Sequence, residues 1–189
     1  MRELSLQVLD LVRNSIEAGA TQVALAITED FTADRLTIEI RDNGRGMNSE
    51  ECRRALDPFV TSNQTRKAGV GLGLPLVDMY TRQCGGCLSL ESSPGKGTTV
   101  KAVYQHSHLD RPPLGSMTET VKAIIIGNPK LDFRYSHTVG QRTFCVTTYE
   151  LTGILGDIPL THPDVLIWIT DYLSGHFNYL YGGGPGENH

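Results

Sequence analysis

Asp42 is a candidate hydrogen-bond acceptor for a ligand, because its carboxylate lies at the end of a predicted strand. It has the same parity as the alternating apolar residues of 36–40, so it continues the core-facing side of a predicted strand. Gly44 and Gly46 follow at once and allow a tight turn with close backbone approach. Because an unpaired carboxylate there is costly, such an acceptor suits a ligand with an N–H donor, for example the exocyclic amine of adenine. The alternative is that Asp42 only caps its own Asp-Asn-Gly turn.

A glycine-rich stretch, "GVGLGL" from Gly69 to Leu74, predicts a phosphate site. A loop of this kind that enters a helix offers free N–H groups and the positive end of the helix dipole to an anion. The stretch lacks the preceding strand and the spacing of a dinucleotide-binding fingerprint. Lys96 in "PGKGTT" is not a P-loop lysine, because Gly97 stands where serine or threonine should follow it, so we assign it to a hairpin.

A third set of polar residues lies near the N-terminus. Asp10, Asn14 and Glu17 fall on one face of a predicted helix at about 100° per residue, while an apolar stripe occupies another face. The helix therefore lines up a carboxylate, an amide and a second carboxylate. An ordinary solvated face is the alternative, since Glu3 and Gln7 lie on the same side.

The apolar pattern predicts the elements that position these groups. From the N-terminus, these are a helix ending at Gly19, strands over 21–27 and around 36–40, a helix over 49–56, a long polar loop over 57–70, a helix within 71–83, and strands over 87–93 and 97–105. A loop as long as 57–70 is often a functional lid.

The C-terminal part predicts a small α+β appendage over residues 119–181, after a Pro-rich linker at 108–118 and before a flexible tail at 182–189. Its expected elements are a helix over 118–126, strands over 131–137 and 142–148, and helices over 149–155 and 163–180 with Thr161 or His162 near the cap of the last. A segment of this size buries a marginal core alone, so we expect it to pack on the first domain or on a partner. Its histidines are not at metal-ligand spacing.

Composition narrows the class of protein. The chain has 189 residues, 39% of them hydrophobic and 20% charged, which describes a globular protein of one domain, or of one domain with a small appendage. The net charge of -4 argues against a nucleic-acid partner. Apolar runs are too short for a membrane span or a signal peptide, so we expect a cytoplasmic protein with reduced cysteines. Cys84-Gly-Gly-Cys87 has no second pair to complete a zinc site and predicts a helix cap and turn.

The order of these motifs resembles the GHKL superfamily, which includes gyrase B, heat-shock chaperone ATPases, sensor histidine kinases and MutL. The resemblance covers residues 1–105 and runs through "DLVRNSIEAGA", "DNGRGM", "DPFVTS", "GVGLGL" and the strand start "GTTV". It implies an α+β fold, a two-layer sandwich of a mixed sheet covered on one face by helices, over residues 1–107.

The resemblance also implies a role for each matching residue. Asn14 would hold Mg²⁺ against the phosphates of ATP, and Asp42 would accept from the adenine amine, partly through water. The other nucleotide contacts that it implies are Gly44 and Gly46 beside the purine, Gly69, Gly71 and Gly73 around the phosphates, Thr98 on the adenine side, and Arg66 or Lys67 against phosphate charge. Glu17 stands where MutL and gyrase have an aspartate. A structural role for Glu17 is at least as well supported as a role in the site.

One departure bears on catalysis. Asp10 is the implied catalytic acid, but ATPases of the superfamily usually place a glutamate there. Since a base must come within about 3 Å of its water and aspartate is one methylene shorter, binding is better supported than hydrolysis.

The expected function is that of a Mg²⁺-ATP-binding regulatory protein, a protein kinase or an ATP-dependent switch acting on a protein partner. Two alternatives stay open: a MutL- or gyrase-like ATP hydrolase, and a non-catalytic adenine-nucleotide sensor that signals through residues 119–189. We do not expect a complete histidine kinase, because no room precedes the first helix for a hairpin bearing the phosphoacceptor histidine. There is likewise no N-terminal strap of the kind gyrase-like dimers exchange.

Overall fold

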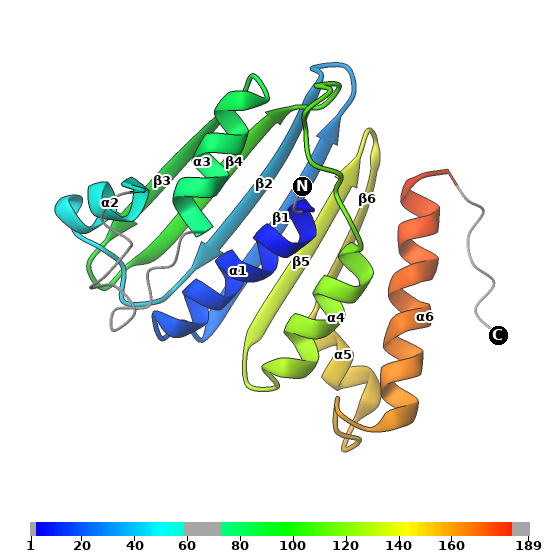
Figure 1. The fold of residues 1–189 in the computed structure, drawn as a ribbon. Coiled ribbons are helices and arrows are strands. Elements are labelled where there is room, and N and C mark those ends of the chain that lie inside the picture. The colour runs from blue at the N-terminus through cyan, green and yellow to red at the C-terminus, as the bar shows by residue number, and fades with distance from the viewer. Residues whose placement is uncertain (1–2, 59–72, 183–189) are drawn as a thin grey trace.

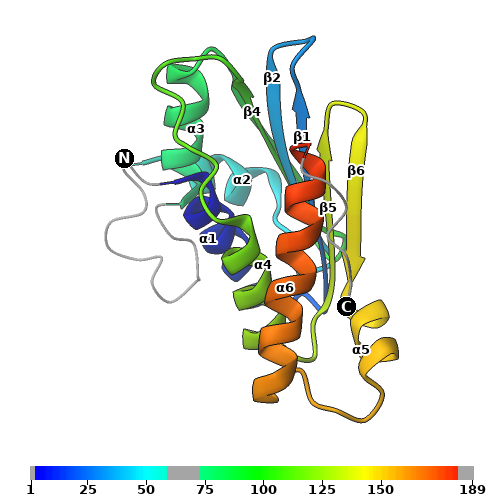
Figure 2. The same cartoon turned by 90° about the vertical axis from the view of Figure 1, so that its right-hand side faces the viewer.

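The computed structural model describes residues 3–58 and 73–182, in which one six-stranded mixed sheet carries helices on one face (Figures 1 and 2). In chain order the elements are α1 (Leu4–Glu17), β1 (Gln22–Asp30), β2 (Arg35–Asp42), α2 (Ser49–Leu56), α3 (Gly73–Gln83), β3 (Cys87–Ser93), β4 (Gly97–Gln105), α4 (Met117–Gly127), β5 (Asp132–Val139), β6 (Arg142–Thr147), α5 (Thr148–Leu155) and α6 (Pro163–Leu180). This confirms the predicted α+β fold class.

The strand order β3-β4-β2-β1-β5-β6 places β1 and β2 at the centre of the sheet. All neighbours are antiparallel except β1 and β5, which are parallel and pair Leu25 with Tyr135. The parallel pair joins segments more than a hundred residues apart, so β5 and β6 extend the sheet begun by residues 22–105. Residues 119–181 therefore share a sheet with residues 1–107. The division of the chain into a domain and an appendage at residues 108–118 stays a prediction.

The core lies between the sheet and its helices. Alternate residues of β1, Val23, Leu25 and Ile27, are buried because strand side chains alternate between the two faces. Helix α1 covers them with the predicted apolar stripe, and α4 adds Ile124 and Ile125 to the same cluster. The two ends of the chain thus bury one continuous core.

The linker after β4 packs against the start of α1. The first N–H groups of a helix lack intrahelical partners, and α1 has no side-chain cap. The carbonyls of Pro113 and Leu114 fill this place, because they accept from the backbone N–H groups of Leu4 and Ser5 at 2.9 and 2.8 Å. The Pro-rich segment predicted as a linker thereby connects the C-terminal part to the helix that carries Asp10 and Asn14.

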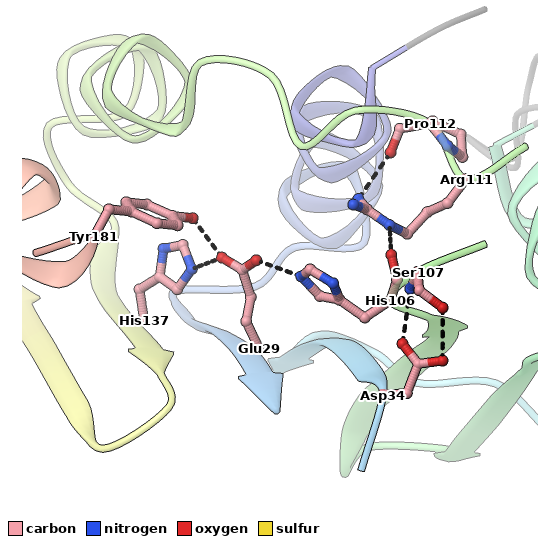
Figure 3. Close-up of polar contacts among 8 residues, drawn as sticks. All are labelled: Glu29, Asp34, His106, Ser107, Arg111, Pro112, His137 and Tyr181. Carbon is pink, nitrogen blue, oxygen red and sulfur yellow. Dashed lines mark hydrogen bonds and ion pairs between the residues drawn. The ribbon is translucent and has the colours of Figure 1, made fainter. Parts of the chain in front are cut away.

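A buried polar cluster joins the two parts at the far end of β1 (Figure 3). Glu29 accepts from His106 Nε2 at 2.9 Å, from His137 Nε2 at 3.0 Å and from the hydroxyl of Tyr181 at the end of α6. Burial raises the pKa of Glu29, but the hydrogen bonds from His137, Tyr181 and His106 outweigh it and lower that pKa to about 2. The carboxylate therefore stays ionised inside the protein and ties α6 to the sheet.

Most predicted elements are present, with shifted ends. The first predicted strand continues from residue 27 to Asp30, and the first helix ends at Glu17, two residues before Gly19, whose φ is +80°. His162, one of the two candidates, caps α6 by accepting from the N–H of Asp164 at 3.3 Å. The predicted lid at 57–70 and the tail at 182–189 fall almost entirely outside the described residues.

Candidate functional site

A pocket opens between α1, the end of β2 and the start of β4. Helices α2 and α3, which both pack against β3, each add a lining residue to it. Its lining residues are Leu11, Asn14, Ser15, Glu17 and Ala18 from the α1 region, Asp42, Arg45, Gly46 and Met47 from β2 and the following turn, Ala55, Leu74, Thr98 and Val100. The predicted residues Asn14, Asp42, Gly46 and Thr98, which are far apart in the sequence, therefore meet around one hollow.

The carboxylate of Asp42 is held by three donors. Its Oδ1 accepts from the backbone N–H groups of Gly44 at 2.9 Å and Thr98 at 3.1 Å. Its Oδ2 accepts from the hydroxyl of Ser15 at 2.6 Å. Asp42 thus caps its own turn, as the alternative interpretation predicts, and it also lines the pocket. Among the described residues, its Oδ2 accepts a hydrogen bond from Ser15 alone. A carboxylate has about four acceptor positions, so Oδ2 retains room for a ligand N–H.

Two glycines are required by the close packing of the turns beside Asp42. A Cβ on Gly46 would lie 1.9 Å from the carbonyl oxygen of Ser93, and one on Gly97 would lie 1.9 Å from that of Asp42. Both have positive φ, +66° and +82°, which L-residues with side chains rarely adopt. Gly44 is less constrained, since its Cβ would meet Ala18 and Asp42 at 3.1 Å. The turn after β2 therefore packs directly on the β3–β4 hairpin.

The polar face of α1 divides into parts with different surroundings. Asn14 is half-buried at the pocket, with its Nδ2 3.7 Å from the position that a Cβ on Gly73 would take. Because Gly73 starts α3, the Asn14 amide lies beside the N-terminus of that helix. Asp10 is exposed and lies outside the pocket lining. Glu17 lines the pocket and also pairs with Arg13 at 2.9 Å.

Part of the predicted phosphate site cannot be placed. Gly69, Gly71, Arg66 and Lys67 lie outside the described residues, as does most of "DPFVTS". Gly73 is described and begins α3, whose Leu74, Pro75 and Val77 are buried. The structure therefore brings Asn14, Asp42, Gly46 and Thr98 together, while their roles and the loop contacts stay predictions.

Sequence reasoning missed two serines that organise the pocket. Ser15 belongs to the apolar stripe of α1, and its polarity in that stripe was the available signal. Ser92 accepts from the N–H of Met47 at 2.8 Å, donates to the carbonyl of Gly97 at 2.9 Å and contacts the hydroxyl of Thr98 at 2.9 Å. It joins the turn after β2 to the hairpin, and no local pattern in "CLSLESS" marked it.

Comparison with known proteins decides the family. The model of the histidine kinase-, DNA gyrase B- and HSP90-like ATPases matches residues 2–107, more than half of the chain. The chain belongs to this family. The family match ends where the linker begins, so it covers α1 through β4 and every predicted site residue.

Curated relatives of this ATPase-family chain are much longer proteins. It is 32% identical over 95 residues to sporulation kinase C of Bacillus subtilis, covering 50% of this chain and 22% of that protein. It is 30% identical over 116 residues to the cell-division control histidine kinase PdhS of Brucella ovis, covering 54% and 11%. A sensor protein described as putative from Shewanella frigidimarina is 28% identical over 110 residues, covering 58% and 17%. The chain spans less than a quarter of the length of these three relatives.

A solved ATPase domain shares the fold over most of the present chain. The MutL ATPase domain of Aquifex aeolicus complexed with ADP matches with a TM-score of 0.51 and 16% identity, covering 91% of this chain and 70% of that one. This coverage extends beyond residue 107, so the shared fold includes part of the C-terminal segment.

Within residues 3–58 and 73–182, no helix is long and apolar enough to cross a membrane. In the same residues, no group of three or more His, Cys, Asp or Glu side chains could hold a metal ion. Cys84 is buried and Cys87 exposed around the Gly85-Gly86 turn that follows α3.

Proposed function

We propose that this protein binds Mg²⁺-ATP in the pocket beside Asp42 and acts as a regulatory protein kinase or ATP-dependent switch on a protein partner. The observation that carries the proposal is the oriented carboxylate of Asp42 in the pocket wall. Its Oδ1 accepts from two backbone N–H groups, whereas its Oδ2 accepts from the hydroxyl of Ser15. An adenine amine would donate to Oδ2, whereas the carbonyl of guanine at the same place would be repelled by it.

The proposed Mg²⁺ site rests on Asn14. Magnesium usually keeps several waters and takes one or two protein oxygens together with phosphate oxygens. The half-buried Asn14 amide lies beside the N-terminus of α3, where a helix favours phosphate, so one amide oxygen at this place fits the ion. Bound there, the ion would neutralise phosphate charge, and Asn14 would orient it.

Family membership and the ADP-bound structural match support nucleotide binding, while the choice between transfer, hydrolysis and sensing is part of the proposal. One relative named as a histidine kinase and another named as a sporulation kinase favour phosphotransfer. Asp10 is the proposed base, one helical turn before Asn14. An ATP hydrolase and a non-catalytic sensor remain the second and third candidates.

Calorimetry of ATP and GTP with the parent and Asp42→Asn tests the pocket. The variant should bind ATP about 10- to 100-fold more weakly, the effect of losing a hydrogen bond to a charged group, and should discriminate less against GTP. Asn14→Ala should reduce chiefly the part of the affinity that depends on Mg²⁺. Unchanged ATP binding by a folded Asp42→Asn protein would refute the assignment.

A further inference from the structure

The face of the sheet away from the helices carries a groove that the nucleotide proposal does not use. Figure 2 shows α1, α3, α4 and α6 on one side of the strands, so alternate strand residues point away from them. The groove lies where β2 ends and β1 begins, and three cations line it: Arg41, Lys96 and Arg134.

The strand register creates a notch in this groove. Ala24 of β1 pairs with Arg41 on one side and with Arg134 on the other, so the two arginines flank a methyl group on the same face. Two strand spacings separate their backbones by about 9.6 Å. Thr99 and Thr147 continue the row beyond Arg41 and Arg134. A small residue between two guanidinium groups leaves space for a negatively charged group.

The other cations on this face have acidic neighbours. Lys101 Nζ lies 3.6 Å from Glu39 Oε2, and Arg35 pairs in register with Asp30. By contrast, no ion pair within residues 3–58 and 73–182 involves Arg41, Arg134 or Lys96. Three unneutralised cations at one place are unexpected in a chain of net charge -4.

Two carboxylates line the same groove and offset part of this charge. The carboxylate of Asp132 lies beside the notch, where its Oδ2 accepts a hydrogen bond from Gln22 Nε2 at 3.1 Å. The carboxylate of Asp42 is bound by Ser15, Gly44 and Thr98 on the helix side of the sheet. On the face away from the helices, the three cations therefore outnumber the one carboxylate of Asp132, and the groove keeps a net positive charge.

We propose that this groove docks an acidic, extended peptide segment of a partner protein. An extended chain in the polyproline II conformation has three residues per turn and advances about 3.1 Å per residue, so carboxylates three residues apart lie on the same side, about 9.3 Å apart, and match the spacing of Arg41 and Arg134. Tyr149, 83% exposed at the same groove, adds an aromatic surface for the peptide. A nucleic-acid backbone fits less well, because Glu39 and Glu91 on the same face beyond the groove would repel a longer, continuous row of phosphates.

The groove and the nucleotide pocket share a wall. Asp42 lines both, and the next residue, Asn43, lines the groove while its Oδ1 accepts from the N–H groups of Thr21 and Gln22 at 2.9 Å. A docked segment would lie against the strand end that carries Asp42. The proposal does not rest on nucleotide binding, so it is tested without nucleotide.

The experiment measures fluorescence anisotropy of a labelled peptide of repeating Glu-Ala-Ala units with the full chain, against a matched Gln-Ala-Ala peptide. We expect binding of the Glu peptide only, weakened by raising salt from about 0.05 to about 0.5 M. Arg41→Gln and Arg134→Gln should each reduce affinity up to about fivefold, and the double variant about twentyfold. Arg35→Gln is the matched control, because it removes the same charge from the same strand and face outside the groove.

Several results would overturn the proposal. They are no binding of the Glu peptide to the parent, equal binding of the Gln peptide, or an equal effect of Arg35→Gln. Tighter binding of a DNA oligonucleotide with the same dependence on Arg41 and Arg134 would assign the groove to nucleic acid instead. Circular dichroism of each variant checks that its fold is intact, so that lost binding reports on the groove.

Discussion

The hydroxyl of Ser15 donates to Oδ2 of Asp42 at 2.6 Å, joining α1 to the end of β2 across 27 residues of sequence. With Gly44 and Thr98 holding Oδ1, this contact fixes the plane of the carboxylate. Ser15 itself is buried in the apolar stripe of α1. The proposed adenine acceptor is therefore oriented by a residue from outside the motif in which Asp42 lies.

Ser15→Ala should make nucleotide selection poorer. Removing the Ser15 hydroxyl removes one of the hydrogen bonds that fix the orientation of the Asp42 carboxylate. We therefore expect ATP to bind about threefold to tenfold more weakly, with a smaller preference for ATP over GTP. Calorimetry with both nucleotides measures this. Ser5→Ala is the control, because Ser5 lies on the same helix and its hydroxyl binds Glu3 away from the pocket. An unchanged ATP-to-GTP ratio in Ser15→Ala would remove Ser15 from the site.

Asp10→Asn should separate binding from turnover. The substitution keeps the size of the side chain and removes its ability to take a proton, so ATP affinity should stay within about twofold while hydrolysis or phosphotransfer is lost. Calorimetry and release of labelled phosphate measure the two quantities. Glu3→Gln, on the same side of the helix near its start, should change neither. Parental turnover in Asp10→Asn would make Asp10 an ordinary surface residue.

Gly46→Ala should destabilise the turn beside the pocket far more than Gly95→Ala. Both glycines have positive φ, +66° and +75°, so both substitutions carry a backbone cost of about 1–2 kcal/mol. Only the Cβ at position 46 would clash with backbone, at 1.9 Å from the Ser93 carbonyl oxygen, while position 95 is open. We expect Gly46→Ala to lose at least about 3 kcal/mol of unfolding free energy in urea. Equal losses in the two variants would contradict the close packing of this turn on the hairpin.

Glu29 should make stability fall in acid. Its pKa in the folded protein is about 2, below the ordinary value of 4.5, so its contribution is present above about pH 4.5 and is lost as the pH falls toward 2. Between pH 5 and pH 3 the parent should lose about 2 kcal/mol from this group, measured by urea unfolding. Glu29→Gln should lack this component.

The matched control for that titration is Glu39→Gln. Glu39 lies on the neighbouring strand β2 and pairs with Lys101 at 3.6 Å with its side chain 40% exposed. Its removal should leave the acid sensitivity of the parent in place. The same pH dependence in Glu29→Gln and in the parent would show that the titration of Glu29 does not cause the loss of stability in acid.

Local pattern was sufficient to predict much of this protein. Alternation of apolar residues located β2 and the inward parity of Asp42, and the 3.6-residue period located α1 with Asn14 on its polar face. These features follow from side-chain geometry within a single element, so a short stretch of sequence determines them. The order of the motifs then predicted the family that the comparisons show.

Contacts between distant segments were decided only by the tertiary structure. That Ser15 meets Asp42, that β5 pairs with β1, and that Tyr181 reaches Glu29 each depend on how separate elements pack. Periodicity tells which face of an element is buried but not which element covers it, because every apolar face satisfies the same hydrophobic driving force. For this reason the sequence predicted an appendage that packs on the first domain or on a partner, and only the structure showed that strand pairing over more than a hundred residues places this segment in the same sheet.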